Sequence, residues 1–188
     1  MADRRVGIFG GVFNPVHNGH VAIVSHAIHE LNLSKLYVVP CSDPPHKPIP
    51  SVSALERFRM TDMAFGDTED VIVSQIEIKR PGRSYTIDTI REIQALEPDA
   101  RPVLIIGADN IDEIQKWKEP DAIYHESDIA AFTRPGHILH DKRIILVEME
   151  PYPISSTEIR EKLQAGTPVD KLIPSSVLDY IKLQKLYI

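Results

Sequence analysis

Two glycines and two histidines near the start of the chain have the types and spacing of a phosphate-binding site. Gly10 and Gly11 follow an apolar run, and His17 and His20 stand at the head of a helical pattern. Adjacent glycines let the backbone approach a ligand, and the free amides and positive dipole end of a helix N-terminus attract anions. Two histidines three residues apart project from one face of the first turn. We interpret this stretch as a nucleotide-phosphate site.

Each of these features also has a simpler explanation. A glycine pair after a strand is often only a turn, and a His-x-x-His pair can bind a metal or lie on the surface. Zinc would need a third ligand at short spacing, and Cys41 is the single cysteine of the chain. We therefore assign no metal ligands. The stretch lacks the Gly-Lys-Ser/Thr of a Walker loop and the third glycine of the dinucleotide fingerprint.

Short β-rich runs alternate with helical patterns along most of the chain. This alternation is typical of an α/β protein, and we expect a Rossmann-like doubly wound parallel sheet with helices on both faces. Ligands of such sheets lie beyond the carboxyl ends of the strands. The candidate residues Gly10, Gly107 and Arg134 each follow a predicted strand. The expected strands are residues 5–9, 36–39, 71–73, 103–106, 129–132 and 144–147.

Length and composition indicate one globular domain, residues 1–188. A chain of this length buries about 70% of its unfolded surface. The hydrophobic fraction of 43% and the charged fraction of 26% are ordinary for globular proteins. No apolar run approaches the ~20 residues of a membrane span, so we expect no membrane partner.

The N-terminal residues and the charge restrict location and partners. Charged residues lead directly into a strand without an apolar signal region, and one cysteine excludes an internal disulfide, so we expect a cytoplasmic protein. The net charge of −6 argues against a nucleic-acid partner, because nucleic-acid backbones bind basic faces. Whether the chain forms a homo-oligomer stays open.

Basic residues beside prolines are candidates for gathering phosphate. Prolines exclude a helix over residues 40–50. This segment is either a stiff surface connection or a lid whose Lys47 brings positive charge to phosphate, and we favour the lid. Arg134 stands in a similar loop. In the helix expected over residues 53–65, Arg57 and Arg59 are most simply a solvated face.

Two helix starts carry hydroxyl groups. Ser84, Tyr85 and Thr86 precede a helical pattern, and a cap that leaves amides open would suit a carboxylate ligand, although a cap needs no such function. Ser155 and Glu158 have capping-box spacing. Arg160 follows within reach of that helix start, where it would add a fixed charge to a bound phosphate. The alternative is simply a well-capped helix.

Asp109 and Trp117 complete the candidates. Asp109 follows the fourth predicted strand, where a carboxylate can accept hydrogen bonds from ribose hydroxyls or can cap a helix. Trp117 is the single tryptophan and lies between two lysines. Its polar flanks suggest a partly exposed ring on which a base or a pyridine could stack, although a core position is the commoner role.

These motifs resemble those of a known family. The stretch GGVFNPVHNGH is similar to the GGxFxPxHxGH signature of the nucleotidyltransferase superfamily, and ISSTEIR is similar to its second signature. PPHK, SYT, GADN, Trp117 and RPG occur in the order found in bacterial nicotinate mononucleotide adenylyltransferases, so the resemblance covers nearly the whole chain. One difference is Asn14, where many superfamily members have aspartate. An amide cannot supply a metal carboxylate, so we assign Asn14 no metal role.

The resemblance implies transfer of the adenylyl group of ATP to nicotinate mononucleotide, giving deamido-NAD and pyrophosphate, with Mg²⁺ carried by ATP. It implies catalytic roles for His17, His20 and Arg160. The residues expected to bind ATP and its phosphates are Gly10, Gly11, Phe13, Lys47, Gly107, Asp109, Arg134, Ser155, Ser156 and Thr157. Those expected to bind the nicotinate are Ser84, Tyr85, Thr86, Trp117 and Lys118.

Other functions stay open at this point. The same chemistry could act on nicotinamide mononucleotide or on a phosphopantetheine-type acceptor. A noncatalytic nucleotide sensor is an alternative of another class. The presence of His17, His20 and Arg160 together tells against a sensor, because binding alone has less need of all three.

Overall fold

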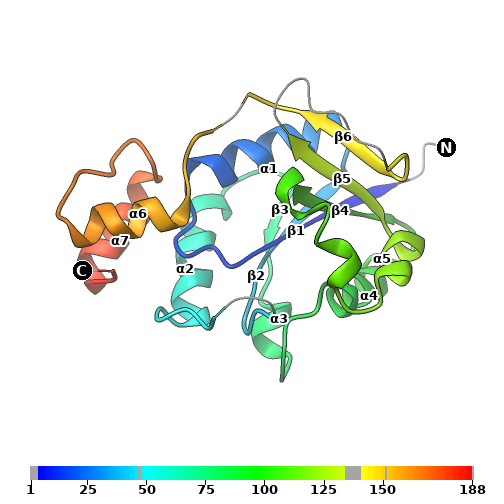
Figure 1. Ribbon diagram of the computed structural model, residues 1–188, viewed down its shortest axis with the longest axis horizontal. Helices are drawn as coiled ribbons and strands as arrows, with labels where there is room; N and C mark the ends of the chain where they lie inside the picture. The colour runs from blue at the N-terminus through cyan, green and yellow to red at the C-terminus, as the bar shows by residue number, and fades with distance from the viewer. Residues whose placement is uncertain (1–3, 46–47, 134–140, 151, 188) are drawn as a thin grey trace.

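The computed structural model describes residues 4–45, 48–133, 141–150 and 152–187 (Figure 1). Its strands form one sheet in which every pair is parallel, in the order β3-β2-β1-β4-β5-β6. This is the doubly wound order of Rossmann-like sheets, and it confirms the predicted fold class. The strands are β1 (Arg5–Gly11), β2 (Lys35–Pro40), β3 (Val71–Val73), β4 (Arg101–Gly107), β5 (Asp128–Thr133) and β6 (Ile144–Glu148).

Helices connect the strands and close the chain. The helices are α1 (Asn18–Glu30), α2 (Ala54–Phe65), α3 (Ile76–Lys79), α4 (Thr86–Leu96), α5 (Pro120–Glu126), α6 (Ser156–Gln164) and α7 (Ser175–Gln184), with short 3₁₀ turns η1 (Ala108–Asn110) and η2 (Ile114–Lys116). Within the described part of the chain, no helix combines the length and the apolar character that crossing a bilayer requires.

Alternation of side chains along the strands builds a core on each face of the sheet. In β2, Leu36 and Val38 belong to one buried cluster, whereas Tyr37 and Val39 belong to the other. Such alternation follows from the two-residue period of a strand. The first cluster packs against α1, α2, α6 and α7, and the second against α4 and α5. Helices therefore cover both faces, as expected.

The strand order changes direction between β1 and β4. β1 pairs with β2 on one side and with β4 on the other, so the chain after β1 and the chain after β4 run to opposite faces. The crevice beyond the carboxyl ends at such a switch point is the general ligand site of doubly wound sheets. Gly10 and Gly11 end β1, and Gly107 ends β4. All three glycines therefore lie at the switch point.

The prediction that Arg57 lies on a solvated face of α2 is wrong. Its side chain is only 1% exposed and lies on the same face as Met60 and Phe65, which pack into the core. Leu55 and Met63, two of the apolar residues of this helical pattern, are both 44% exposed instead. Arg59 lies on the exposed side, as predicted. Hydrogen-bond acceptors in the core, described below, account for the burial of Arg57.

The C-terminal helices pack beside α2 at one end of the molecule (Figure 1). α7 contributes Val177, Leu178 and Ile181 to the first core cluster, and α6 contributes Ile159 and Leu163. The start of α6 thereby lies near the loop that follows β1. This packing brings the last part of the sequence to the first strand.

Candidate functional site

The loop between β1 and α1, residues 12–17, is shaped by Phe13. Phe13 is buried, has a left-handed φ of 47°, and packs its ring edge-on against His20 with centroids 4.9 Å apart. A Cβ atom on Gly11 would lie 2.9 Å from that ring, so any larger residue would push the Phe13 ring out of its place. A Cβ on Gly10 would meet nothing within 4 Å. Gly11 thus makes room for the Phe13 ring, whereas Gly10 leaves its backbone open to a ligand.

His17 and His20 stack against each other at the start of α1. Their ring centroids are 3.6 Å apart and their planes differ by 26°. The backbone N–H of His17 donates to Nδ1 of His20 over 3.1 Å. Because Nδ1 accepts this bond, the proton of the neutral His20 ring lies on Nε2, which makes that atom a hydrogen-bond donor. The structure thus brings the two imidazoles together, as predicted.

Both imidazoles are held in the neutral form. Burial lowers the pKa of His17 to about 4. Burial also lowers the pKa of His20 well below its usual value, and the neighbouring His17 adds to this effect. Within the described residues, Nδ1 of His17 is buried without a hydrogen-bond partner. At neutral pH the pair therefore acts through N–H groups rather than through positive charge.

We predict that His17 makes the fold sensitive to acid. Its pKa falls from 6.5 in the unfolded chain to about 4 in the folded chain, so the unfolded chain binds more protons between these values. The contribution is complete above pH 6.5 and is lost as the pH falls towards 4. Between pH 7 and pH 5 the parent should lose about 2 kcal/mol more of its free energy of unfolding than His17→Asn.

Urea unfolding of both proteins at the two pH values measures this difference. The groups other than this histidine pair are common to both chains and cancel in the comparison. The part of the lowered pKa of His20 that comes from His17 is lost in the variant together with His17, so the difference reports on the pair. Parallel losses in the parent and in His17→Asn would contradict the lowered pKa of His17.

The N-terminus of α6 is bonded to the loop after β1. Oγ of Ser156 donates to the carbonyl of Pro15 over 2.9 Å, and Nη1 of Arg160 donates to the carbonyl of Asn14 over 2.8 Å. Nη2 of Arg160 donates to Oγ1 of Thr157 over 3.1 Å. Ser155 caps the helix by accepting from the N–H of Glu158, as its spacing predicts. Two helix N-termini therefore converge on one loop.

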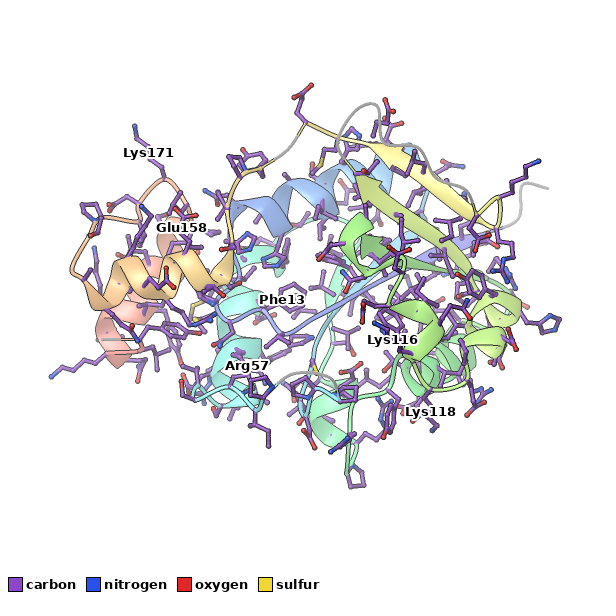
Figure 2. The ribbon with its side chains drawn as sticks, viewed as in Figure 1. Phe13, Arg57, Lys116, Lys118, Glu158 and Lys171 are labelled. Carbon is purple, nitrogen blue, oxygen red and sulfur yellow. The ribbon has the colours of Figure 1, made fainter. Side chains whose placement is uncertain are left out.

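Arg57 holds this loop from the other side. Its guanidinium donates to the carbonyls of Val12 at 2.6 Å, Ser42 at 3.3 Å and Val52 at 3.3 Å. Figure 2 shows Arg57 on α2 next to Phe13. Among the residues that the structure describes, no carboxylate lies within ion-pair distance of Arg57. The sequence did not predict this role, because nothing in the local pattern distinguishes Arg57 from the exposed Arg59.

The segment after β2 connects the loop after β1 to the predicted nicotinate residues. The N–H of Cys41 donates to the carbonyl of Gly11 over 2.8 Å. Oγ of Ser84 accepts from the N–H of Ser42 at 3.0 Å, and the N–H of Ser84 donates to the carbonyl of Asp43. Ser84 is therefore no helix cap, which corrects its predicted role. Its hydroxyl is used by the neighbouring segment.

Tyr85 and Thr86 begin α4 beside Lys118. Tyr85 is the N-cap residue, and its side chain makes no cap hydrogen bond. The amides of the first turn therefore receive no acceptor from the cap side chain. Nζ of Lys118 binds the Asp88 carboxylate at 2.8 and 3.0 Å and lies 5.0 Å from the ring centroid of Tyr85. Trp117 is half-buried and packs at the edge of the second core cluster. Tyr85, Trp117 and Lys118 therefore lie together, and their binding of nicotinate stays a prediction. Figure 2 shows the place of Lys118 in the molecule.

Asp109 lies just beyond β4, in η1. Its carboxylate folds back over the Cα atom of Gly107, so a Cβ on Gly107 would collide with it. Asp109 is exposed, and its Oδ1 accepts from Nδ2 of Asn110 at 3.2 Å. The carboxylate lies at the end of the fourth strand, as predicted, and its binding of ribose stays a prediction. Lys47 and Arg134, the two loop cations of the prediction, lie outside the described residues.

One residue that sequence analysis did not single out also reaches the loop after β1. The Tyr187 hydroxyl donates to Oδ1 of Asn14 over 2.7 Å. These residues are 173 positions apart, and no short motif around Tyr187 indicates the contact.

Comparison with known proteins agrees with this geometry. The cytidylyltransferase-like family model matches residues 8–162. Proteins named probable nicotinate-nucleotide adenylyltransferase are similar to this chain: that of Thermus thermophilus is 37% identical, with 97% of this chain and 99% of the relative covered, and that of Bacillus licheniformis is 33% identical, with 98% of each covered.

A solved structure has the same fold. Nicotinic acid mononucleotide adenylyltransferase of Plasmodium falciparum, complexed with NaAD, matches with a TM-score of 0.80 at 21% identity, covering 98% of this chain and 97% of that one. At this identity the likeness supports the fold alone. The family model and the full-length relatives carry the assignment, and they show that the chain belongs to the cytidylyltransferase-like family and, within it, to the nicotinate-nucleotide adenylyltransferases.

Proposed function

We propose that this protein transfers the adenylyl group of ATP to nicotinate mononucleotide, giving deamido-NAD and pyrophosphate. One observation carries the proposal: the stacked His17–His20 pair at the start of α1 and the start of α6 with Arg160 are bonded to the same loop at the carboxyl end of β1. Membership of the nicotinate-nucleotide adenylyltransferases supports the choice of acceptor.

The reaction needs positioning and charge stabilisation more than a base. A phosphate oxygen of the mononucleotide attacks the α-phosphorus of ATP, the bond from that phosphorus to the bridging oxygen breaks, and pyrophosphate leaves. The attacking phosphate is already an anion, so no side chain must remove a proton. This fits a site whose imidazoles are neutral. Nε2–H of His20 would donate to the oxygen on which negative charge grows.

The phosphates would lie between the two helix N-termini. Open amides and the dipole ends of α1 and α6 favour anions there, and the open backbone at Gly10 admits them. Arg160 would add charge-assisted hydrogen bonds, since its bonds to Asn14 and Thr157 leave further N–H groups unused among the described residues. Mg²⁺ would arrive bound to ATP, as part of the substrate. We place this activity in the cytoplasm, where the reduced Cys41 is expected.

The acceptor pocket should prefer the acid to the amide. The open amides at the start of α4 and the backbone beside Lys118 are donors, and a nicotinate carboxylate accepts two hydrogen bonds from them. A carboxamide would place its own NH₂ against one donor, and an unpaired buried polar group costs on the order of 1–3 kcal/mol. We therefore expect kcat/KM for nicotinate mononucleotide to exceed that for nicotinamide mononucleotide by roughly tenfold.

A pyrophosphate-release assay with ATP and a panel of acceptors tests both parts of the proposal. The panel contains nicotinate mononucleotide, nicotinamide mononucleotide and phosphopantetheine. Equal or inverted preference between the two pyridine nucleotides would overturn the acceptor and leave adenylyl transfer standing. ATP binding without release of pyrophosphate for any acceptor would overturn the enzyme assignment.

A further inference from the structure

The C-terminal residues turn back to the loop after β1. α7 ends at Gln184, and Lys185 then has a left-handed φ of 53°. Tyr187 has a left-handed φ of 65°. Residues other than glycine rarely adopt this conformation, and it persists where the surroundings over-determine it. The turn directs Leu186 and Tyr187 towards the first core cluster, against which both pack.

The Tyr187 hydroxyl has one hydrogen-bond partner among the described residues, Oδ1 of Asn14 at 2.7 Å. In this bond the phenol is the donor, and burial raises the pKa of Tyr187, so the phenol keeps the proton that it donates. Asn14 therefore uses its side-chain oxygen as an acceptor. Its backbone carbonyl is also taken, because Arg160 donates to it.

The bond from Tyr187 fixes which way the Asn14 side-chain amide faces, and the bond from Arg160 holds its backbone. With Oδ1 directed to Tyr187, Nδ2 is directed away from it, and Nδ2 donates to no group in the described ranges 4–45, 48–133, 141–150 and 152–187. Asn14 is partly exposed, three residues before His17, and bonded to Arg160. Its unused NH₂ group thus lies at the place where two helix N-termini and a guanidinium gather for phosphate.

We propose that Tyr187 is a positioning residue, which orients Asn14 so that its NH₂ group donates to a phosphate oxygen of ATP. This inference rests on the proposed function. The C-terminal segment is then part of the active site through the residue that it orients.

A double-mutant cycle tests the inference. The variants are Tyr187→Phe, Asn14→Ala and both together, with kcat/KM for ATP measured at saturating nicotinate mononucleotide. Loss of one oriented donor should lower kcat/KM about fivefold to tenfold in Tyr187→Phe. Because Tyr187 acts through Asn14, the double variant should be no worse than Asn14→Ala. Independent effects that multiply in the double variant would overturn the proposal.

Tyr180→Phe is the matched control. Tyr180 lies in α7 and its hydroxyl donates to Glu56 at 2.6 Å, away from the loop after β1. The Tyr180 hydroxyl also accepts from Nη1 of Arg59 at 3.4 Å, so its removal costs at least as many hydrogen bonds as removal of the Tyr187 hydroxyl. Tyr180→Phe should therefore lose at least as much stability as Tyr187→Phe, but only Tyr187→Phe should lose ATP use. Equal kcat/KM in the two variants would show that Tyr187 only anchors the C-terminus.

Calorimetric titration with ATP alone separates this inference from the proposed function. Asn14→Asp keeps an acceptor for Tyr187 and loses the NH₂ group, so its affinity for ATP should fall about tenfold or more at unchanged thermal stability. Parent-like ATP affinity in Asn14→Asp would overturn the inference even if turnover is normal. A second outcome separates the two proposals in the other direction. If the parent binds ATP but transfers nothing, and Asn14→Asp still loses ATP affinity relative to it, the proposed function is overturned and the inference stands.

Discussion

Replacing His20 by alanine should lower kcat about a hundredfold or more, which corresponds to ~3 kcal/mol of transition-state stabilisation. The ring sits at the first turn of α1 with its Nδ1 taken by the N–H of His17, so its one available donor is Nε2–H. Loss of one preorganised donor at the developing charge has an effect of this size. Pyrophosphate release at saturating ATP and nicotinate mononucleotide measures it.

His29→Ala is the matched control for this experiment. His29 lies in the last turn of the same helix and is exposed, so its loss should leave kcat within a factor of two of the parent. Circular dichroism shows whether both variants keep the fold. Turnover of a folded His20→Ala within a few-fold of the parent would remove His20 from the reaction.

Replacing Arg57 by methionine should lower the free energy of unfolding by about 4 kcal/mol. Three buried or partly buried carbonyls, from Val12, Ser42 and Val52, lose their donor at once. Each unsatisfied buried acceptor costs about 1–3 kcal/mol, and relief from burying a charge offsets part of the total. Activity should fall as well, because Val12 begins the loop that carries His17. Urea unfolding with a fixed m-value measures the loss.

Arg59→Met provides the comparison, since Arg59 stands two residues away on the exposed face of α2 with a 2.7 Å ion pair to Glu56. Its loss should change the free energy of unfolding by no more than about 0.5 kcal/mol. Similar losses for the two arginines would show that the carbonyl contacts of Arg57 contribute little.

Most of the sheet could be predicted because each strand carries its own signal. Strands of a parallel sheet are buried on both faces, so they appear as continuous apolar runs, and all six were placed within two residues of their observed ends. The start of α6 could be predicted from an equally local signal, since Ser155 and Glu158 are three residues apart and form the predicted cap bond. The histidine pair was predictable for the same reason.

Features that depend on distant partners could not be predicted. Arg57 was assigned to solvent because its acceptors come from three separate segments, one of them 45 residues away. Ser84 was assigned as a cap, whereas its hydroxyl accepts from the segment after β2. α3 and α5, with 4 and 7 residues, are too short to show a helical periodicity. The contact of Tyr187 carries no local signal at all.

The bonds between the loop after β1 and the end of the chain also have a consequence for protein synthesis. Asn14 is made 146 residues before Arg160 and 173 residues before Tyr187. At about 5–20 residues per second, the ribosome supplies these partners roughly seven to thirty-five seconds after the loop. A nascent chain can therefore pair its first strands long before it has a phosphate site. Unfinished chains should not compete with the completed protein for ATP.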